Sequence, residues 1–333
     1  MLLVVNAGSS SVKVALFDGL NEVRRDQVAE IAGDGHKAAL ELLLRDGFGQ
    51  GLTAAAHRVV HGGARLTRAC RVDAGVLAEI AACVPLAPLH NPANLAGIRA
   101  LVDLAPGLPQ FASFDTAFHA TNPEVAQRYA VPAAVAAAGI RRYGFHGLSF
   151  SAIVRKVKEM ADRVGPDRLL ALHLGNGASL CAIRDGQSVA TTMGYSPLDG
   201  LTMGTRSGSI DGNAVLRMAE LYGVEGAGRI LNRESGLLAL GGSNDMRVLQ
   251  GSVAGRFAVE HFCYWAVRHA GSMIAAMGGL DAMAFTGGIG ENDAVVRGAI
   301  VDGLRWAGEV PVWVIPADEE RQIAAEVLEL MQT

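Results

Sequence analysis

Three glycine-rich turns contain the residues best suited to chemistry on a polyphosphate. Each follows an apolar run, and they span residues 7–11 (AGSSS), 175–179 (GNGAS) and 287–292 (GGIGEN). Small side chains let backbone N–H groups approach phosphate oxygens, and Lys13 adds a cation beside the first turn. A helix that we expect after Asn292 would direct its N-terminal N–H groups toward an anion. Together the turns predict a nucleotide site.

The sequence excludes one common phosphate-binding loop and disfavours another. It has no Gly-Lys dipeptide and therefore no Walker A loop, whose lysine contacts the phosphates. Leu180 and Asp293 stand where a GxGxxG motif starting at Gly175 or Gly288 would need its third glycine. A Rossmann dehydrogenase is therefore disfavoured.

The first two turns lie within a duplicated segment. Residues 2–19 (LLVVNAGSSSVKVALFDG) align without a gap to residues 169–186 (LLALHLGNGASLCAIRDG), at a constant offset of 167. Each copy reads as an apolar strand, a turn of small residues, a second strand and an Asp-Gly turn, which is the pattern of a β-hairpin. Two such hairpins predict paired lobes, and with the late GGIG turn they describe an actin-like ATPase cleft.

The hairpins lie among alternating strands and helices, as is typical of an α/β protein. Helices are predicted to begin at Asn91-Pro92 and at Ser149 or Ser151. A long helix from Phe257 to Met277 should precede a strand from Ala282 to Thr286.

Composition limits the remaining classes. A chain of 333 residues that is half apolar is expected to form about two domains. The net charge of −4 argues against a nucleic-acid partner. Four widely spaced cysteines without a CxxC pair indicate a reducing compartment rather than a disulfide framework or a zinc site. Because no signal peptide and no apolar run of about 18 residues occurs, we expect a cytoplasmic protein without a membrane partner.

An ordered series of motifs runs from residue 1 to about residue 330: VNAGSSSVK (5–13), HRVVHGG (57–63), PLAPLHNPANL (85–95), FDTAFH (114–119), RYGFHG (142–147), HLGNG (173–177), MGTRSGSID (203–211), SNDMR (243–247), FTGGIGEN (285–292) and IPADEE (315–320). This series resembles the acetate kinase family, within the acetate and sugar kinase/Hsp70/actin superfamily. The resemblance implies reversible, direct in-line transfer of the ATP γ-phosphoryl group to acetate, giving acetyl phosphate and ADP. It also implies a homodimer.

The resemblance assigns four catalytic residues. Arg58 and Arg206 would hold the acyl carboxylate and stabilise the moving phosphoryl group, because a guanidinium offers a planar fork to such oxygens. His146 would stabilise the transition state by donating a hydrogen bond. Asp115 matches the family's catalytic carboxylate, but a carboxylate substrate is already ionised and demands no general base, so its role stays open.

The resemblance also implies the ligand-binding residues. Those for ATP are Lys13, His173, Leu174, Gly175, Asn176, Gly177, Asp245, Met246, Arg247, Gly288, Ile289, Gly290, Glu291 and Asn292. Asn6 and Glu319 match the positions for Mg²⁺, with Mn²⁺ as an alternative. Glu319 also has a structural interpretation, because an acidic residue at the start of the helix carrying Ile323, Val327 and Met331 would favour the helix dipole.

An apolar cup for the acyl methyl group is implied beside Arg58, lined by Val60, Leu89, Phe145 and Pro197. One methylene is worth about 1–3 kcal/mol in such a pocket, so discrimination between acetate and propionate should be modest. The predicted fold is α/β with two duplicated actin-like (ribonuclease H-like) lobes and a nucleotide cleft between them. The acyl lobe comprises residues 1–147 plus 320–333, and the nucleotide lobe, with the dimer interface, comprises residues 148–319.

Two departures from the family pattern leave alternatives open. The chain is shorter than typical members, with losses before His57 and between Asn292 and Ile315. Leu148-Ser149-Phe150 replaces the usual Thr-Ser-His, which removes polar groups near the acyl side. The alternatives are a propionate or butyrate kinase, and a non-catalytic ATP-binding protein of the actin/Hsp70 type.

Overall fold

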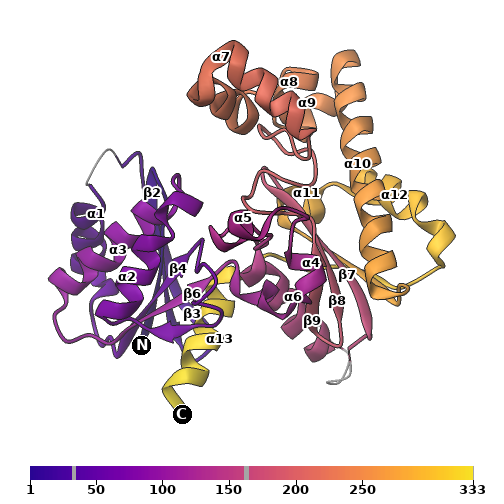
Figure 1. Cartoon of the computed structure of the whole chain (residues 1–333). Coiled ribbons are helices and arrows are strands. Elements are labelled where there is room, and N and C mark those ends of the chain that lie inside the picture. The colour runs from indigo at the N-terminus through magenta and orange to yellow at the C-terminus, as the bar shows by residue number, and fades with distance from the viewer. Residues whose placement is uncertain (32–34, 161–164, 333) are drawn as a thin grey trace. The chain divides into compact units, whose positions relative to one another are not determined.

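The computed structural model describes residues 1–31, 35–160 and 165–332 (Figure 1). The chain divides into two compact units, each of which contains one β-sheet. The first unit comprises Met1–Ala120, Gly147–Ala152 and Asp318–Thr333, and the second comprises Thr121–His146 and Ile153–Ala317.

The first unit is built on a six-stranded sheet of order β3-β2-β1-β4-β6-β5. Its strands are β1 (Leu2–Ala7), β2 (Ser11–Asp18), β3 (Asn21–Ala29), β4 (Ala54–Val59), β5 (Cys70–Arg71) and β6 (Gln110–Phe114). β1, β4 and β6 run parallel, so their carboxyl ends meet at one edge of the sheet. The main helices of this unit are α1 (His36–Leu43), α2 (Ala74–Ala82), α3 (Asn91–Leu104) and α13 (Glu319–Gln332).

Both faces of the first sheet are covered, because side chains alternate along each strand. One face, with Leu3 and Val5, packs against Leu40 of α1 and Leu101 of α3. The other face, with Leu2 and Val4, packs against α13 through residues such as Ile323. We call this second side the α13 face.

The second unit repeats the plan with a five-stranded sheet of order β11-β10-β7-β8-β9. Its strands are β7 (Arg168–Leu174), β8 (Ala178–Arg184), β9 (Gln187–Thr191), β10 (Ala282–Thr286) and β11 (Val312–Val314). Its helices are α4 (Glu124–Gln127), α5 (Ala133–Ala137), α7 (Gly212–Arg233), α8 (Gly236–Gly241), α9 (Met246–Gln250), α10 (Val253–Met277), α11 (Gly287–Asn292) and α12 (Ala294–Gly303), and most of α6 (Gly147–Met160) lies here too. The shared strand order confirms the predicted α/β fold with two actin-like lobes.

The duplicated hairpins differ by one residue at the first turn. In the first hairpin Ala7 pairs with Val12, whereas in the second Leu174 pairs with Ala178. The second turn is therefore one residue shorter, and the ungapped alignment holds for β1 and β7 but is wrong by one residue along β2 and β8. The extra residue is confined to the turn and leaves strand pairing intact.

Three predicted helix boundaries need correction. α6 begins at Gly147 rather than at Ser149 or Ser151, and α10 begins at Val253, where Ser252 accepts a hydrogen bond from the Gly255 N–H. The GGIGEN segment forms the short helix α11 itself. The predicted end of α10 before Gly278 and the strand Ala282–Thr286 are confirmed. Within the described ranges, no helix is long and apolar enough to cross a membrane.

Candidate active site

A cluster of one arginine and two carboxylates lies at the carboxyl edge of the first sheet. Arg58 is near the end of β4, Asp115 directly follows β6, and Glu319 is the first residue of α13. The Arg58 Nε and Nη2 atoms donate to the Asp115 carboxylate at 3.1 and 2.8 Å, and Nη1 lies 3.0 Å from Glu319 Oε2. The structure therefore brings together three predicted site residues from three separate segments.

Burial and charge pairing set the protonation behaviour of this cluster. Burial raises the pKa of Asp115 from its ordinary value of 3.8 to about 6, although the charge of Arg58 acts in the opposite direction. Burial alone would lower the pKa of Arg58, but the two facing carboxylates raise it above its usual range. Arg58 is therefore a permanent cation, whereas Asp115 ionises near neutral pH.

Asn6 and Lys13 lie on the same face of the sheet as Arg58. They pair with each other across β1 and β2, and by alternation both belong to the α13 face. The carboxyl edge of this face thus carries an amide and two cations close to the carboxylates. No group of three His, Cys, Asp or Glu side chains that could hold a metal occurs within the described residues.

Two buried asparagines, which were not among the predicted site residues, support the edge from α3. Asn91 accepts from the His61 N–H and donates to the His61 carbonyl oxygen. Asn94 accepts from the Val60 N–H at 3.0 Å and donates to the Ala7 carbonyl oxygen at 2.8 Å. The sequence feature that could have indicated this role is NPAN inside the PLAPLHNPANL motif, where a helix begins with two amide side chains three residues apart.

In the second unit, His146 and His173 stack at a centroid distance of 4.1 Å. His146 directly precedes α6, and its Nδ1 lies 2.8 Å from the Ser179 hydroxyl of β8. Its backbone φ of 59° is in the left-handed region, which is unusual for a residue other than glycine. Such strain often marks a functional position.

Arg206 shares this location with His146. A Cβ atom added to Gly177 would lie 2.9 Å from Arg206 Nη2 and 3.3 Å from His146 Nε2, so both side chains contact the same glycine. Arg206 Nη1 donates to the Pro197 carbonyl oxygen at 2.7 Å, and burial lowers the pKa of this guanidinium. The structure thus brings His146, His173, Gly177 and Arg206 together.

The predicted ATP-binding segments of the second unit also meet here. Asn244 donates to the Asn176 side chain at 3.3 Å, which joins the SNDMR segment to the HLGNG turn. Gly287 has a φ of 81° and packs so closely on the Leu174 backbone that a side chain would clash there. SNDMR and GGIGEN therefore each contact the HLGNG turn.

Several of the predicted ATP residues have partners within the protein. Asp245 accepts from the Arg247 N–H and pairs with its guanidinium, while Asn292 donates to the Gly288 carbonyl oxygen. The Glu291 carboxylate accepts from the N–H groups of Gly287 and Ala317, both at 3.0 Å.

The helix expected after Asn292 is present as α12, and Asp293 caps its N-terminus. Asp293 Oδ1 accepts from the Val295 and Val296 N–H groups at the start of α12. A side chain of the protein therefore already occupies this helix N-terminus.

The residues predicted for the acyl cup are divided between the units. Val60 and Leu89 belong to the first unit, and Phe145 and Pro197 belong to the second. Leu148, Ser149 and Phe150 are all fully buried at the start of α6, and Leu148 packs in the hydrophobic core of the α13 face. The departure from the family pattern therefore lies in a core segment.

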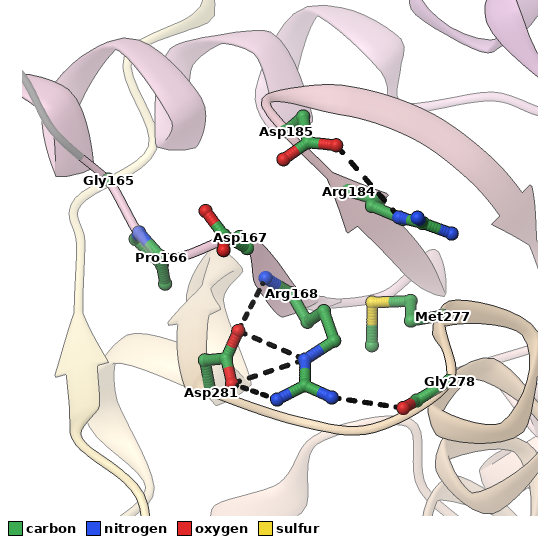
Figure 2. Close-up of a pocket in the computed structure, with 9 residues that line it drawn as sticks. All are labelled: Gly165, Pro166, Asp167, Arg168, Arg184, Asp185, Met277, Gly278 and Asp281. Carbon is green, nitrogen blue, oxygen red and sulfur yellow. Dashed lines mark hydrogen bonds and ion pairs between the residues drawn. The ribbon is translucent and has the colours of Figure 1, made fainter.

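A pocket of about 710 Å³ in the second unit lies away from these residues (Figure 2). It is lined by residues at the start of β7 and just before β10, where Arg168 forms a bidentate pair with Asp281. None of the predicted site residues lines this pocket.

The chain is similar to known proteins in both sequence and structure. The model of the acetokinase family matches residues 25–326. An acetate kinase of Pseudomonas aeruginosa is 43% identical over 388 aligned positions, covering 99% of this chain and 98% of that protein. The crystal structure of Porphyromonas gingivalis acetate kinase superposes with a TM-score of 0.92 at 32% identity and covers 99% of both chains. A propionate kinase from Francisella tularensis gives 0.91 at 34% identity over 98% of both chains.

The alignment with the Pseudomonas protein is longer than this chain of 333 residues, so that relative contains segments that this chain lacks. The same architecture is nevertheless matched over nearly the whole length of the solved structures. A family model that covers most of the chain and relatives this similar from end to end show that the chain belongs to the acetokinase family.

Proposed function

We propose that the chain is an ATP-dependent kinase that phosphorylates acetate to acetyl phosphate, reversibly and by direct in-line transfer. The observation that carries this proposal is the Arg58 cluster, because a partly buried permanent cation at a sheet edge suits a small carboxylate. Membership of the acetokinase family supports the reaction type.

Arg58 would bind the acyl carboxylate. Of its five N–H donors, two point to Asp115 and one to Glu319, which leaves two for a ligand. Asp115 and Glu319 hold the guanidinium from two sides and so orient the remaining donors. We therefore assign Asp115 an orienting role rather than that of a general base.

The second unit would bind ATP and stabilise the transferring group. A carboxylate oxygen of acetate forms the new bond to the γ-phosphorus, the bond from that phosphorus to the β,γ-bridging oxygen breaks, and ADP leaves with the electron pair. Arg206 and His146 would neutralise charge on the moving phosphoryl group. The predicted ATP residues from Lys13 to Asn292 would hold the nucleotide.

Mg²⁺, or Mn²⁺ in its place, would be held by Asn6 and Glu319. The donor set fits, because Mg²⁺ prefers oxygen ligands, keeps several waters and needs few protein groups. Glu319 offers a carboxylate whose Oε2 pairs with Arg58, so metal and arginine would share it. When bound, the ion would offset the negative charge of the phosphate groups.

We also propose the remaining features expected from the family. Residues 1–147 plus 320–333 would form the acyl lobe and residues 148–319 the nucleotide lobe, although residues 121–146 pack with the second unit. The protein would act in the cytoplasm, without nucleic-acid or membrane partners, as a homodimer. Exposed apolar side chains support an interface on α7 and α10: Leu216, Leu221, Tyr222, Val224, Phe257 and Tyr264.

The decisive experiment is a hydroxamate assay with Mg-ATP, hydroxylamine and acetate, propionate or butyrate. We expect acyl hydroxamate from acetate, with the highest kcat/KM of the three acids. A preference for propionate would favour the second candidate, which the match to the propionate kinase supports. Equal use of butyrate would contradict the ranking, and no product from any acid would favour a non-catalytic ATP-binding protein.

A further inference from the structure

We propose that Arg142 and Asp199 are positioning residues, whose ion pair fixes Arg206 relative to His146. The inference rests on the proposed function, since it concerns two residues assigned to phosphoryl transfer. Neither member of the pair belongs to the predicted site.

Arg142 joins the segment that carries His146 to the end of β9. Its Nη1 lies 3.1 Å from Asp199 Oδ2 and 3.2 Å from the carbonyl oxygens of both Thr192 and Met193. The backbone of the same segment is attached as well, because the Tyr143 N–H donates to the Gly194 carbonyl oxygen at 3.0 Å. His146 lies four residues after Arg142, so these contacts fix the position of the segment that carries His146.

Asp199 closes the loop that carries Arg206. Its Oδ1 accepts from the Ser209 hydroxyl at 2.6 Å and from the Gly200 N–H at 2.9 Å. The Ser209 N–H in turn donates to the Gly200 carbonyl oxygen at 3.0 Å. The loop from residue 199 to residue 209 is thus tied at its base by the same carboxylate that binds Arg142.

The side chain of Arg206 then completes the connection. Its Nη1 donates to the carbonyl oxygen of Pro197, two residues before Asp199, and its Nη2 lies against Gly177 beside His146. Two routes therefore link His146 with Arg206: one through Gly177, and one through the Arg142–Asp199 pair.

The surroundings leave little freedom to this pair. The Arg142 and Asp199 side chains are 25% and 34% exposed, and the guanidinium lies over the Tyr129 ring at 5.4 Å. The Tyr129 hydroxyl accepts from the Tyr195 N–H at 2.9 Å. A Cβ on Gly194 would lie 2.6 Å from Asp199 Oδ2. A partly exposed ion pair usually contributes little to stability, so an effect on catalysis is the more telling measurement.

Asp199→Asn tests the proposal, because the amide oxygen can still accept from Ser209 while the charge is lost. We expect kcat to fall at least tenfold, with the KM for ATP changed less than twofold. In an Arg206→Ala background, Asp199→Asn should lower kcat no further, because the residue acts through Arg206. Arg142→Lys should retain more activity than Arg142→Ala, since it keeps the charge but offers no planar fork.

Asp281→Asn is the matched control. Asp281 pairs with Arg168 in the same unit at similar exposure, 31% and 38%, beside the pocket in Figure 2. It should lose comparable thermal stability and keep its kcat. The proposal is overturned if Asp199→Asn keeps wild-type kcat, or if its loss persists in full in the Arg206→Ala background. Absence of kinase activity in the wild type would instead refute the proposed function.

Discussion

At the scale of single residues, the charge balance around Arg58 decides how Asp115 can act. Asp115 is 3% exposed and has a pKa of about 6, yet it contacts a cation that remains charged at every accessible pH. A general base would need access to a proton on the substrate, and acetate has none at neutral pH. The carboxylate therefore serves best as a fixed counter-charge that orients Arg58.

Asp115→Asn should change how stability depends on pH. The ordinary pKa of 3.8 applies to the unfolded chain and the pKa of about 6 to the folded protein. Between these values the folded state binds a proton that the unfolded state does not, so this group stabilises the fold as the pH falls and destabilises it as the pH rises. We expect the Tm of Asp115→Asn, relative to wild type, to increase from about pH 4 to about pH 7, as measured by differential scanning calorimetry. A constant difference would show that the carboxyl does not titrate in this range.

Arg206→Ala should lower kcat by about 10²–10³-fold, the usual effect of removing one preorganised donor from a transition state. Because Arg206 lies beside Gly177 and is assigned to the moving phosphoryl group rather than to the nucleotide, the affinity for ADP should be nearly unchanged, as measured by calorimetry. Arg217→Ala, which removes an exposed ion pair on α7, is the control and should behave like wild type. An active Arg206→Ala enzyme would refute the assigned role.

At the scale of elements, the hairpin turn between β7 and β8 determines how closely Arg206 and His146 can approach. The turn at Gly177 accepts Arg206 and His146 only because it has no side chain, and the buried amides of α3 fix the corresponding edge of the first sheet. Each of these contacts joins a side chain to the backbone. A substitution can therefore disrupt it without removing a charged group.

Gly177→Ala should reduce kcat at least tenfold in the same assay. The added methyl group would displace Arg206 and His146, whose nitrogen atoms lie 2.9 and 3.3 Å from its position. The far-UV circular dichroism should remain that of wild type. Gly212→Ala, where nothing lies within 4 Å, is the matched substitution and should be silent; equal activity of the two variants would contradict the close contact.

Asn94→Ala should destabilise the first unit. It leaves the Val60 N–H and the Ala7 carbonyl oxygen without their partner, and each unsatisfied buried group costs about 1–3 kcal/mol. A lower midpoint in urea unfolding, compared with the exposed Asn213→Ala, is the expected result. An unchanged midpoint would mean that water replaces the amide.

Sequence reasoning predicted elements better than it predicted contacts between them. The local sequence correctly predicted the end of α10 and the strand that begins at Ala282, because both depend on neighbouring residues. The amide bonds of Asn91 and Asn94 and the pair between Arg58 and Glu319 could not be read from spacing, because they join segments far apart in the chain. The turn shortened by one residue was missed for the same reason, since only strand pairing reveals it.

At the scale of the whole molecule, the duplicated sheets explain why a chain shorter than its relative keeps the family architecture. Both sheets share one order over five strands, and most predicted site residues lie on or next to an element of one of the two units, whereas Pro197 and Arg206 lie in the loop between β9 and α7. Segments absent from this chain therefore do not interrupt the strands that hold the chemistry. The exposed apolar side chains of α7 and α10 form the surface proposed as the dimer interface.

We expect size-exclusion chromatography with light scattering to give twice the 34.7 kDa mass of one chain. Leu221→Asp combined with Tyr264→Glu should shift this mass to that of a monomer, because both residues are exposed apolar positions in the proposed interface. Val23→Glu, on the exposed face of β3, should leave the mass unchanged. A monomeric wild type would exclude the homodimer.

The position of α13 has a consequence for the order in which the protein is made. Its residues Ile323, Ala324 and Val327 fill the core beneath Leu2 and Val4, so the first sheet needs the last helix of the chain to complete its packing. The second unit, in contrast, is complete once Ala317 has been synthesised. Domains usually fold in the order in which the ribosome releases them. Here the first unit emerges first, but one face of its sheet stays uncovered until α13 has been synthesised. The second unit can therefore reach its native state earlier.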